Sequence, residues 1–278
     1  MQTVYDGLFL APGNEKGEQL NSQAKQLHVQ TLGRFIVQIA DETLPDSAWG
    51  RGKARQLFQY FVTYQPRQTP KERIVAELWP GLDAQKADRD FKVALNALQS
   101  ALEPDRQPRA PSAYITRLGT SYGLDPDIPL LVDAVEFEAG ITAASTAAAH
   151  FRAQAIDLYQ HALQLYHGEY LPDTIYEDWS SAMRERLSLL YLNGCNRLAW
   201  LLLAEGNAIG AIDWSQKVIS LDPCWEDAYR LQMRAYMANS NRPLAMRAYQ
   251  QCRQTLAEAL AIEPMAETTA LYEQIKQG

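Results

Sequence analysis

The chain has 278 residues, with 47% hydrophobic and 21% charged side chains and a formal net charge of −7, a composition typical of a globular protein of about two domains. Its first residues lack the basic start of a secretory signal, no apolar run is long enough to cross a bilayer, and the three cysteines stand far apart without a C-x-x-C pair. We therefore expect a cytoplasmic protein with reduced thiols and no membrane contact, which excludes the secreted, disulfide-bonded class.

The negative charge is unevenly distributed along the chain. Residues 133–278 hold 11 basic against 18 acidic side chains, whereas residues 28–132 hold 13 against 12. Within that first part, residues 49–92 hold 9 basic against 5 acidic side chains, a net charge of +4. Attraction to phosphate is local at physiological ionic strength, so an acidic chain can still carry a basic DNA-binding patch here.

The first half begins with a lead-in over residues 1–26, which we expect to be weakly ordered, followed by two expected strands. The segment "LHVQTLGRFIVQI" alternates between apolar and polar residues as half-buried strands do, and the polar "ADETLPD" follows as a turn. In "RGKARQLFQYFVTYQ" the apolar residues recur at helical spacing, and Pro66 stops the helix.

A second, shorter helix is predicted over "TPKERIVAELWP". Thr69 is expected as its N-cap, with Pro70 at the first helical position and Glu72 completing an S/T-x-x-E capping box. Pro80 ends this helix, and Trp79 before it is expected to lie in the core.

The third helix, "RDFKVALNALQSALEP" (residues 89–104), carries two stripes. An apolar stripe has the 3.6-residue period of a helix face that packs on a core, and its members are Phe91, Leu95, Leu98 and Leu102. A polar stripe has the same period, and its members are Arg89, Lys92, Asn96 and Gln99.

A β-hairpin is predicted next, in "YITRLGTSYGLD" around Gly119 and Thr120. Strands, three helices and a hairpin therefore follow one another within residues 27–130. That order is typical of a winged helix-turn-helix with an added N-terminal sheet.

From residue 131 onward the sequence becomes helical and repetitive. Asn207-x-x-x-Ala211 recurs 34 residues later as Asn241-x-x-x-Ala245, and the two segments close with "LDP" and "IEP". A helical-hairpin period of this length is the tetratricopeptide signature, and such repeats stack to leave a concave surface for a partner. The predicted fold is mostly α: a winged helix-turn-helix with N-terminal strands and a C-terminal wing hairpin, then an all-α tetratricopeptide-like domain over residues 131–278.

Several motifs resemble one known family. "WGRGKARQLFQYFV", "KERIVAELWPGLDAQKADRDFKVALNALQSALEP" and "YITRLGTSYGL" resemble the OmpR/PhoB-type winged helix of SARP-like transcriptional activators. "HGEYLPD", "AMRERL" and the last, proline-terminated repeat resemble the bacterial transcriptional activator domain that follows it in that family. The resemblance covers roughly residues 28–275 and implies a regulator that binds direct repeats upstream of promoters. It also implies that the helical domain serves dimerisation, regulation or polymerase contact, and we expect a homodimer or larger assembly on DNA.

The polar stripe supplies the side-chain types that read DNA, because arginine pairs with guanine, asparagine and glutamine pair with adenine, and lysine meets phosphate. The same stripe could also be an ordinary solvated helix face. Family members commonly carry several arginines late in this helix, where Ala97, Gln99 and Ser100 stand here, so we expect modest affinity. The candidate DNA-binding residues are Arg89, Lys92, Asn96 and Gln99 in the third helix, Arg51, Lys53 and Arg55 around the start of the first helix, and Arg117 and Thr120 in the hairpin.

The loop between the second and third helices meets RNA polymerase in the resembled family. The resemblance therefore implies a set of polymerase-contact candidates, namely Gly81, Leu82, Asp83, Gln85 and Lys86. Nothing in the chemistry of the loop itself requires such a contact.

Catalysis is not expected. The four histidines show no H-x-x-x-H or H-E-x-x-H pairing, no cysteine joins them at metal-ligand spacing, and the sequence contains no G-x-S-x-G. The run "GRGKA" does not fit a nucleotide-binding loop, because G-x-x-x-x-G-K-[ST] fails at Ser47 and Ala54. We expect no catalytic residue, metal or cofactor.

The alternative to a DNA reader is a protein-interaction scaffold whose winged domain no longer binds DNA. Aromatic residues gather around the long connection "YHGEYLPDTIYEDW", where most are expected to pack this irregular segment against the repeats and an exposed fraction could contact a partner. These aromatic residues are Tyr159, Tyr166, Tyr170, Tyr176 and Trp179.

Overall fold

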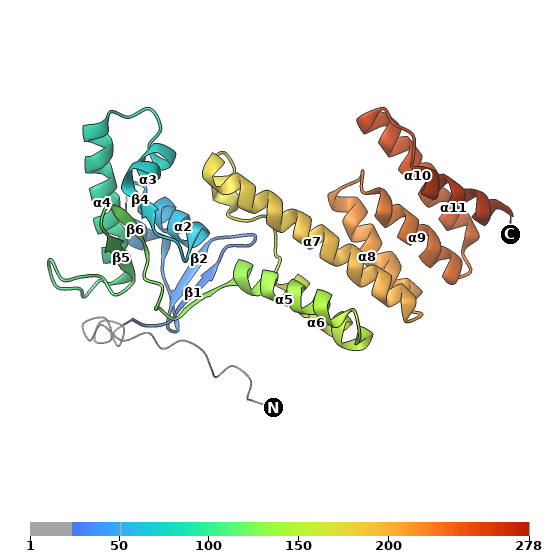
Figure 1. Cartoon of the computed structure of the whole chain (residues 1–278), viewed down its shortest axis with the longest axis horizontal. Coiled ribbons are helices and arrows are strands. Elements are labelled where there is room, and N and C mark those ends of the chain that lie inside the picture. The colour runs from blue at the N-terminus through green and yellow to red at the C-terminus, as the bar shows by residue number, and fades with distance from the viewer. Residues whose placement is uncertain (1–23, 51, 278) are drawn as a thin grey trace. The chain divides into compact units, whose positions relative to one another are not determined.

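The computed structural model describes residues 24–50 and 52–277, so the predicted lead-in up to residue 23 and the candidate Arg51 lie outside the described residues. The chain is mostly helical, and its internal contacts divide it into two units (Figure 1). Unit 1 comprises the described residues up to Thr31, Phe35–Val132 and Asp173–Ala182, and unit 2 comprises Leu32–Arg34, Asp133–Pro172 and the residues from Met183 onward. The contacts thus assign one segment of the helical half, residues 173–182, to the unit that contains the predicted winged domain.

Unit 1 contains a four-stranded sheet with the order β3-β2-β1-β7. Two of its strands are the pair that the sequence predicted: β1 (Leu27–Gln30) pairs antiparallel with β2 (Ile36–Ile39). On its other side, β2 pairs antiparallel with β3 (Glu42–Thr43). The strand β7 (Leu130–Val132) then pairs parallel with β1. The sequence did not predict β7, since a three-residue apolar run is too short to show a strand period.

The helices of unit 1 pack around aromatic side chains. They are η1 (Asp46–Trp49), α2 (Ala54–Tyr64), α3 (Lys71–Leu78) and α4 (Ala84–Leu102). The apolar face predicted for α2 is buried, and its Phe58 ring lies 6.1 Å from Phe35 and 5.6 Å from Trp49 between centroids. Burial of aromatic rings of this size dominates the free energy of such a core.

The capping box predicted for α3 is wrong. Thr69 and Pro70 instead form the short strand β4, which pairs with Tyr122 and Ser121, and no side chain caps the helix. The backbone N–H of Lys71 donates to the carbonyl of Thr120 at 3.0 Å. A backbone carbonyl of the β-hairpin therefore accepts a hydrogen bond from a free N–H group at the start of this helix. A short-range sequence motif cannot reveal such a contact.

The predicted hairpin is formed by β5 (Ile115–Leu118) and β6 (Ser121–Leu124), and with β4 it makes a three-stranded sheet that we call the wing. Its two-residue turn contains Gly119 with φ of +62°, a conformation that glycine adopts without strain. Trp79 is buried as predicted, and Phe91 of α4 contacts both it and Tyr122 of the wing. These rings fix α4 beside the wing.

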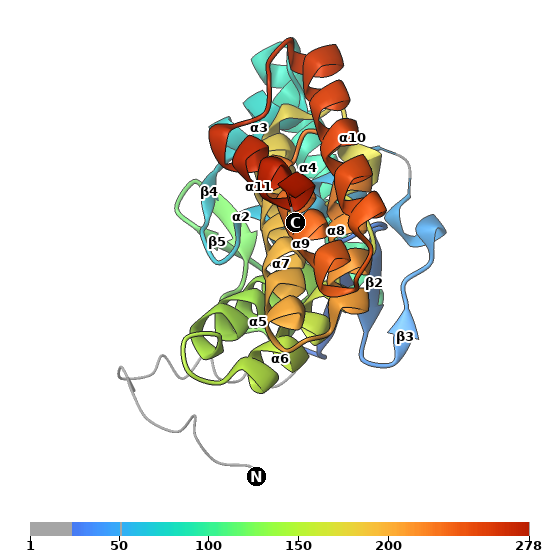
Figure 2. The same cartoon turned by 90° about the vertical axis from the view of Figure 1, so that its right-hand side faces the viewer.

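Unit 2 is a series of antiparallel helices. Its neighbours in sequence pack on one another, α5 on α6, α8 on α9, α9 on α10 and α10 on α11 (Figures 1 and 2). A long helix, α7, starts in the segment assigned to unit 1 and continues into unit 2. The bounds are α5 (Asp133–Ala147), α6 (Arg152–Gln164), η2 (Pro172–Thr174), α7 (Asp178–Ala204), α8 (Ala208–Leu221), α9 (Glu226–Ala238), α10 (Arg242–Leu260) and α11 (Ala266–Gln277).

The 34-residue repeat corresponds to equivalent positions in the helices. The side chain of Asn207 accepts from the N–H of Gly210 at 2.9 Å and caps α8, and Asn241 caps α10 in the same way at 3.3 Å. The alanines four residues later, Ala211 and Ala245, are fully buried. Each repeat therefore pairs a helix N-cap with a small residue that allows close helix packing.

The expectation that no run could cross a bilayer needs one correction. Judged by length and composition alone, α7 is long and apolar enough, with a mean hydropathy of 1.2 over its best 18-residue window. Half of that window is buried inside the structure, as in the core helix of a globular protein. The apolar residues of α7 therefore also serve packing within the protein.

Candidate nucleic-acid interface

The two stripes of α4 lie where the sequence placed them, with one shift. Asp83 begins the helix by accepting from the N–H of Lys86 at 3.0 Å. Phe91, Leu98 and Leu102 are buried, whereas Leu95 is only half-buried because the neighbouring Ala94 takes the buried position. The apolar stripe therefore holds α4 in the core of unit 1 and turns its other side to solvent.

Three of the four residues in the polar stripe are exposed. Arg89, Lys92 and Asn96 face solvent, whereas Gln99 is half-buried and accepts from Nη2 of Arg106 at 3.2 Å. Val93 lies on the same exposed face, with 60% of its surface accessible. Sequence reasoning missed Val93, although its spacing from Arg89 and Asn96 places it between them on a helix. An exposed branched side chain at this position could contact the methyl group of thymine.

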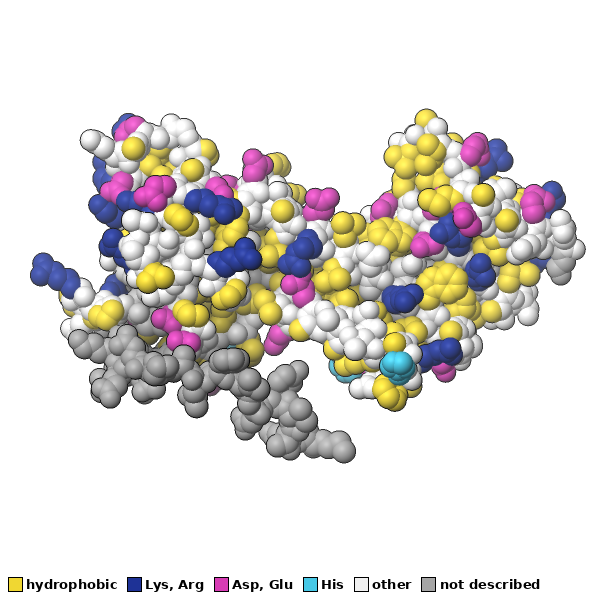
Figure 3. All heavy atoms as spheres, viewed as in Figure 1, with side chains coloured by type: hydrophobic (Ala, Val, Ile, Leu, Met, Phe, Trp, Pro, Cys, Tyr) yellow, Lys and Arg dark blue, Asp and Glu magenta, His cyan; other side chains and the backbone are white. Residues whose placement is uncertain are grey.

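Acidic side chains on α4 neutralise part of this basic face. Asp88 accepts hydrogen bonds from Lys71 at 2.6 Å and from Lys92 at 2.7 Å, and Nε of Arg89 lies 3.4 Å from Asp90. The bonds from Lys71 and Lys92 lower the pKa of the Asp88 carboxyl to about 2, so it is ionised at neutral pH. Figure 3 shows basic and acidic side chains side by side over the region of α4.

The wing presents a second exposed basic group. Arg117 is exposed, its Nε donates to the carbonyl of Gly119 at 2.8 Å, and its guanidinium carbon lies 5.4 Å from the ring centroid of Tyr122. The side chain of Thr120 is exposed, while its backbone carbonyl accepts from Lys71. Leu118 at the same turn is 74% exposed. The turn of the wing thus combines a fixed arginine, a hydroxyl and an apolar side chain.

The remaining described basic candidates, Lys53 and Arg55, make contacts within unit 1. Nζ of Lys53 donates to the carbonyl of Leu78. Nη2 of Arg55 donates to the carbonyl of Phe35 at 3.3 Å and pairs with Asp173 at 3.2 Å. These contacts fasten the two side chains to neighbouring segments, which reduces their freedom to reach phosphate.

Residues 173–179 form a strap on α2, because the chain returns to unit 1 after the first helices of unit 2. Gln59 donates to Asp173 at 3.0 Å and Gln56 donates to Glu177 at 2.6 Å. The Trp179 ring lies 5.5 Å from that of Tyr60. The sequence predicted that such aromatic residues pack the connection against the repeats, and for Trp179 this is wrong.

The other aromatic residues of that connection divide by burial. Tyr159 and Tyr170 are buried, Tyr166 stacks on Tyr191 with centroids 4.2 Å apart, and Tyr176 is 97% exposed. Most of the five aromatic residues therefore pack, as predicted, although Trp179 packs on unit 1, and Tyr176 is exposed to solvent.

The loop before α4 and the first turn of α4 are exposed. Gly81, Leu82 and Asp83 lie in the loop and Gln85 and Lys86 lie in the first helical turn, because α4 begins at Ala84, earlier than the sequence predicted. Gly81 has φ of +79°. A positive φ at this position favours glycine, so the loop shape depends on it.

No group of three or more histidine, cysteine, aspartate or glutamate residues that could hold a metal ion occurs within residues 24–50 and 52–277. The three cysteines are free thiols, and burial raises the pKa of Cys195 and of Cys252 to about 12. A cavity of about 520 Å³ in unit 1 lies between the β2–β3 hairpin and the segment that follows α4, with Leu44, Leu102 and Arg106 among its lining residues.

Comparison with known proteins gives three matches of different kinds. The sequence profile of the bacterial transcriptional activator domain matches residues 132–276. The transcriptional regulatory protein MoaR1 of Mycobacterium tuberculosis is 28% identical over 240 residues, which cover 77% of this chain and 74% of that protein. MoaR1 of Mycobacterium bovis is 28% identical over 241 residues with the same shares.

Among solved structures, Mycobacterium tuberculosis EmbR in complex with a low-affinity phosphopeptide has a similar fold, with a TM-score of 0.78 and 23% identity. The match covers 91% of this chain and 65% of the EmbR chain, so this chain spans about two thirds of that protein's length. The likeness confirms the predicted fold class, a winged helix followed by tetratricopeptide-like helices.

Proposed function

Because the chain belongs to the bacterial transcriptional activator domain family, whose members are transcriptional regulators, we propose that it activates transcription by binding promoter DNA in a sequence-specific way. In this proposal residues 27–130 bind DNA and residues 131–278 mediate dimerisation and partner contacts. The single observation that carries it is the exposed face of α4, where Arg89, Lys92 and Asn96 lie together on a helix whose opposite face is buried in the core beside the wing.

Each residue of this face has a role that follows from its chemistry. Asn96 reads adenine through its amide, and Arg89 reads guanine or holds phosphate, while Lys92 neutralises phosphate. Val93 contacts a thymine methyl group between them. Arg117 and Thr120 of the wing contact the DNA sugar-phosphate backbone or the minor groove. Gln99 stands at the edge of this contact, since its side chain already accepts from Arg106.

The affinity of one copy for DNA is modest, because Asp88 and Asp90 share the basic face with their partner cations. Two copies on neighbouring sites would add their binding free energies, which supports a homodimer or larger assembly on DNA. The exposed segment from Gly81 to Lys86, a loop followed by the first turn of α4, is then available to RNA polymerase in the cytoplasm.

The experiment is selection of bound sequences from random DNA by the purified chain, followed by titration of the selected site at several salt concentrations. A sequence reader retains a preference over competitor DNA and loses affinity steeply with salt. The double variant Arg89→Ala/Lys92→Ala should abolish the preference, whereas Arg253→Ala in α10 removes a charge elsewhere and should not. Equal binding by the double variant and the unchanged chain would contradict the role of α4, and the absence of any sequence preference in the unchanged chain would favour the scaffold alternative.

A further inference from the structure

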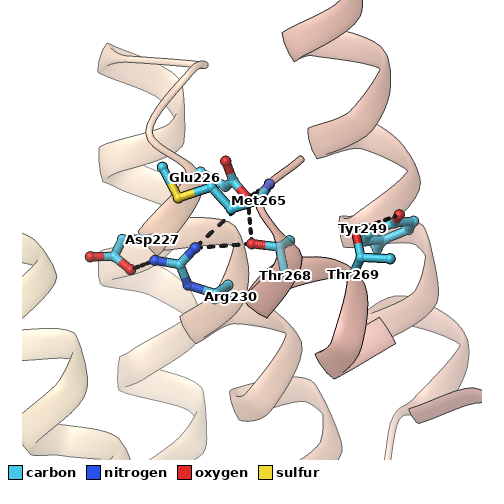
Figure 4. Close-up of polar contacts among 7 residues, drawn as sticks. All are labelled: Glu226, Asp227, Arg230, Tyr249, Met265, Thr268 and Thr269. Carbon is cyan, nitrogen blue, oxygen red and sulfur yellow. Dashed lines mark hydrogen bonds and ion pairs between the residues drawn. The ribbon is translucent and has the colours of Figure 1, made fainter. Parts of the chain in front are cut away.

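Two arginines on successive turns of α9 are held very differently. Arg230 lies in a closed cluster that fastens α11 to α9 (Figure 4): it donates to Thr268 at 2.9 Å and pairs with Asp227. The carboxylate of Glu226, which is 9% exposed, accepts from the N–H of Met265 at 2.7 Å and from the Thr268 hydroxyl. The charge of Arg230 is therefore neutralised within the repeat domain, where this arginine helps to hold α11 against α9.

Arg234, one turn later, has no such partner. It is exposed, and its guanidinium carbon lies 5.6 Å from the ring centroid of Trp200 on α7. Arg234 forms no ion pair with any residue that the structure describes. A guanidinium stacked on an indole keeps its planar edge free, and that edge carries donors spaced for two oxygens of a carboxylate. The Trp200 ring thus orients the Arg234 guanidinium, while no described carboxylate neutralises its charge.

The contact between Trp200 and Arg234 joins the exposed faces of α7 and α9 into one surface. On α7, Leu189, Asn193 and Arg197 precede Trp200 at spacings of four, four and three, so they form one stripe. Leu189 is 46% exposed and Arg197 is exposed, and Arg197 likewise has no ion pair within the described chain. Figure 3 shows basic and hydrophobic side chains interspersed over these helices.

We propose that this surface, Leu189, Arg197, Trp200 and Arg234, binds an acidic peptide segment of a partner protein. The proposal deepens the proposed function, because it names the chemistry of the partner that the repeat domain would contact. Carboxylates of the peptide pair with the two guanidinium groups, one apolar side chain of the peptide packs on Leu189, and another packs on the Trp200 ring about three turns further along α7.

The charge of the surrounding domain favours a short peptide over nucleic acid. Unit 2, which carries this surface, holds 12 basic against 15 acidic side chains, a net charge of −3, which disfavours a polyphosphate chain. A peptide with a few carboxylates needs only local complementarity within a Debye length of about 8 Å, and two unpaired arginines supply it.

The test uses the full chain and a fluorescein-labelled dodecapeptide in which glutamate alternates with leucine. A peptide with lysine in place of every glutamate and a single-stranded oligonucleotide serve as comparison probes. We expect the acidic peptide to bind, to quench tryptophan fluorescence and to lose at least about tenfold in affinity with Arg234→Ala or Arg197→Ala, as expected when a charge-assisted pair is lost. Arg234→Lys should recover only part of the loss, because lysine has no two-pronged donor edge.

Two matched variants separate this surface from the DNA-binding face. Arg253→Ala removes an arginine of α10 that pairs with Glu263 beyond the end of that helix, and it should leave peptide binding unchanged. Arg89→Ala/Lys92→Ala should also leave it unchanged, while Arg234→Ala should retain binding to the selected DNA. The proposal is overturned if both single arginine variants bind the acidic peptide normally, if the lysine peptide binds equally well, or if the oligonucleotide binds more tightly through Arg234.

Discussion

Nζ of Lys92 lies 2.7 Å from Oδ2 of Asp88, which stands one turn earlier in the same helix, α4. The other carboxylate oxygen lies 2.6 Å from Nζ of Lys71 at the start of α3, so one aspartate pairs with Lys92 of the candidate interface and with a second lysine from a neighbouring helix. The face proposed to meet DNA therefore carries its own counter-charge. Phosphate has to compete with Asp88 for Lys92, and this competition lowers the expected affinity.

Replacing Asp88 should strengthen DNA binding. Asp88→Asn removes a negative charge near the phosphates and frees Lys92, so we expect a roughly three- to tenfold gain in affinity and a steeper salt dependence by about one counterion. Titration of the selected site by fluorescence anisotropy at several salt concentrations measures both. Asp105→Asn removes the same charge from an exposed residue beyond the end of α4, and an equal gain there would contradict a specific role for Asp88.

The lowered pKa of Asp88, about 2 against an ordinary value of 3.8, predicts how the ion pairs respond to acid. A carboxyl with a depressed pKa stabilises the fold above its ordinary pKa, and this contribution is lost as the pH falls through the folded-state value. The difference in Tm between the unchanged chain and Asp88→Asn should therefore be constant above about pH 5 and shrink toward pH 2. Circular dichroism melts between pH 2 and 6 measure it, and a difference that persists at pH 2 would contradict the assignment. The effect is small because the Asp88 side chain is still 34% exposed, and solvent screens its ion pairs.

Asn96 should determine specificity more than affinity. Asn96→Ala removes the amide that reads adenine, and we expect a loss of about 1–3 kcal/mol of discrimination at one base pair, with an unchanged salt dependence. Repeating the DNA selection with the variant should give a site that is relaxed at a single position. Ser100→Ala, a small exposed change on the next turn, is the matched control. An altered salt dependence for Asn96→Ala would instead indicate a phosphate contact.

The strap should contribute to the stability of unit 1 although it is distant in sequence. Trp179 is 7% exposed and packs on Tyr60, so Trp179→Ala should cost about 3–5 kcal/mol in the free energy of unfolding. Tyr176 lies three residues earlier and its side chain is exposed, so Tyr176→Ala should change the free energy of unfolding by less than about 0.5 kcal/mol. Urea unfolding followed by circular dichroism distinguishes the two, and equal effects would mean that the strap is not part of this core.

Glu226 should hold α11 in place. Glu226→Ala leaves the N–H of Met265 and the Thr268 hydroxyl without their acceptor, so we expect a local loss of about 1–3 kcal/mol. Hydrogen exchange should become faster in α11 and remain unchanged in α4. Glu273→Ala, which removes an exposed partner of Lys276, should have little effect on exchange. Normal protection of α11 in Glu226→Ala would contradict this role.

Much of the fold was predictable from the sequence, because its signals are local. The period of Phe91, Leu98 and Leu102 fixed the buried side of α4, and the turn at Gly119 fixed the hairpin. The recurrence of Asn207 at Asn241 fixed the repeat, since a helix N-cap is a short-range feature. The exposure of Arg89, Lys92 and Asn96 followed from the same helical period.

Only the tertiary structure decided which charges and segments meet. Asp88 of α4 pairs with Lys71 of α3. The N–H of Lys71 at the start of α3 donates to the backbone carbonyl of Thr120, whereas the sequence predicted a cap by the side chain of Thr69. Trp179 packs on Tyr60 although 118 positions in the sequence lie between them. Periodicity and capping rules describe residues a few positions apart, whereas these contacts depend on where the chain returns after long connections, which no local pattern encodes.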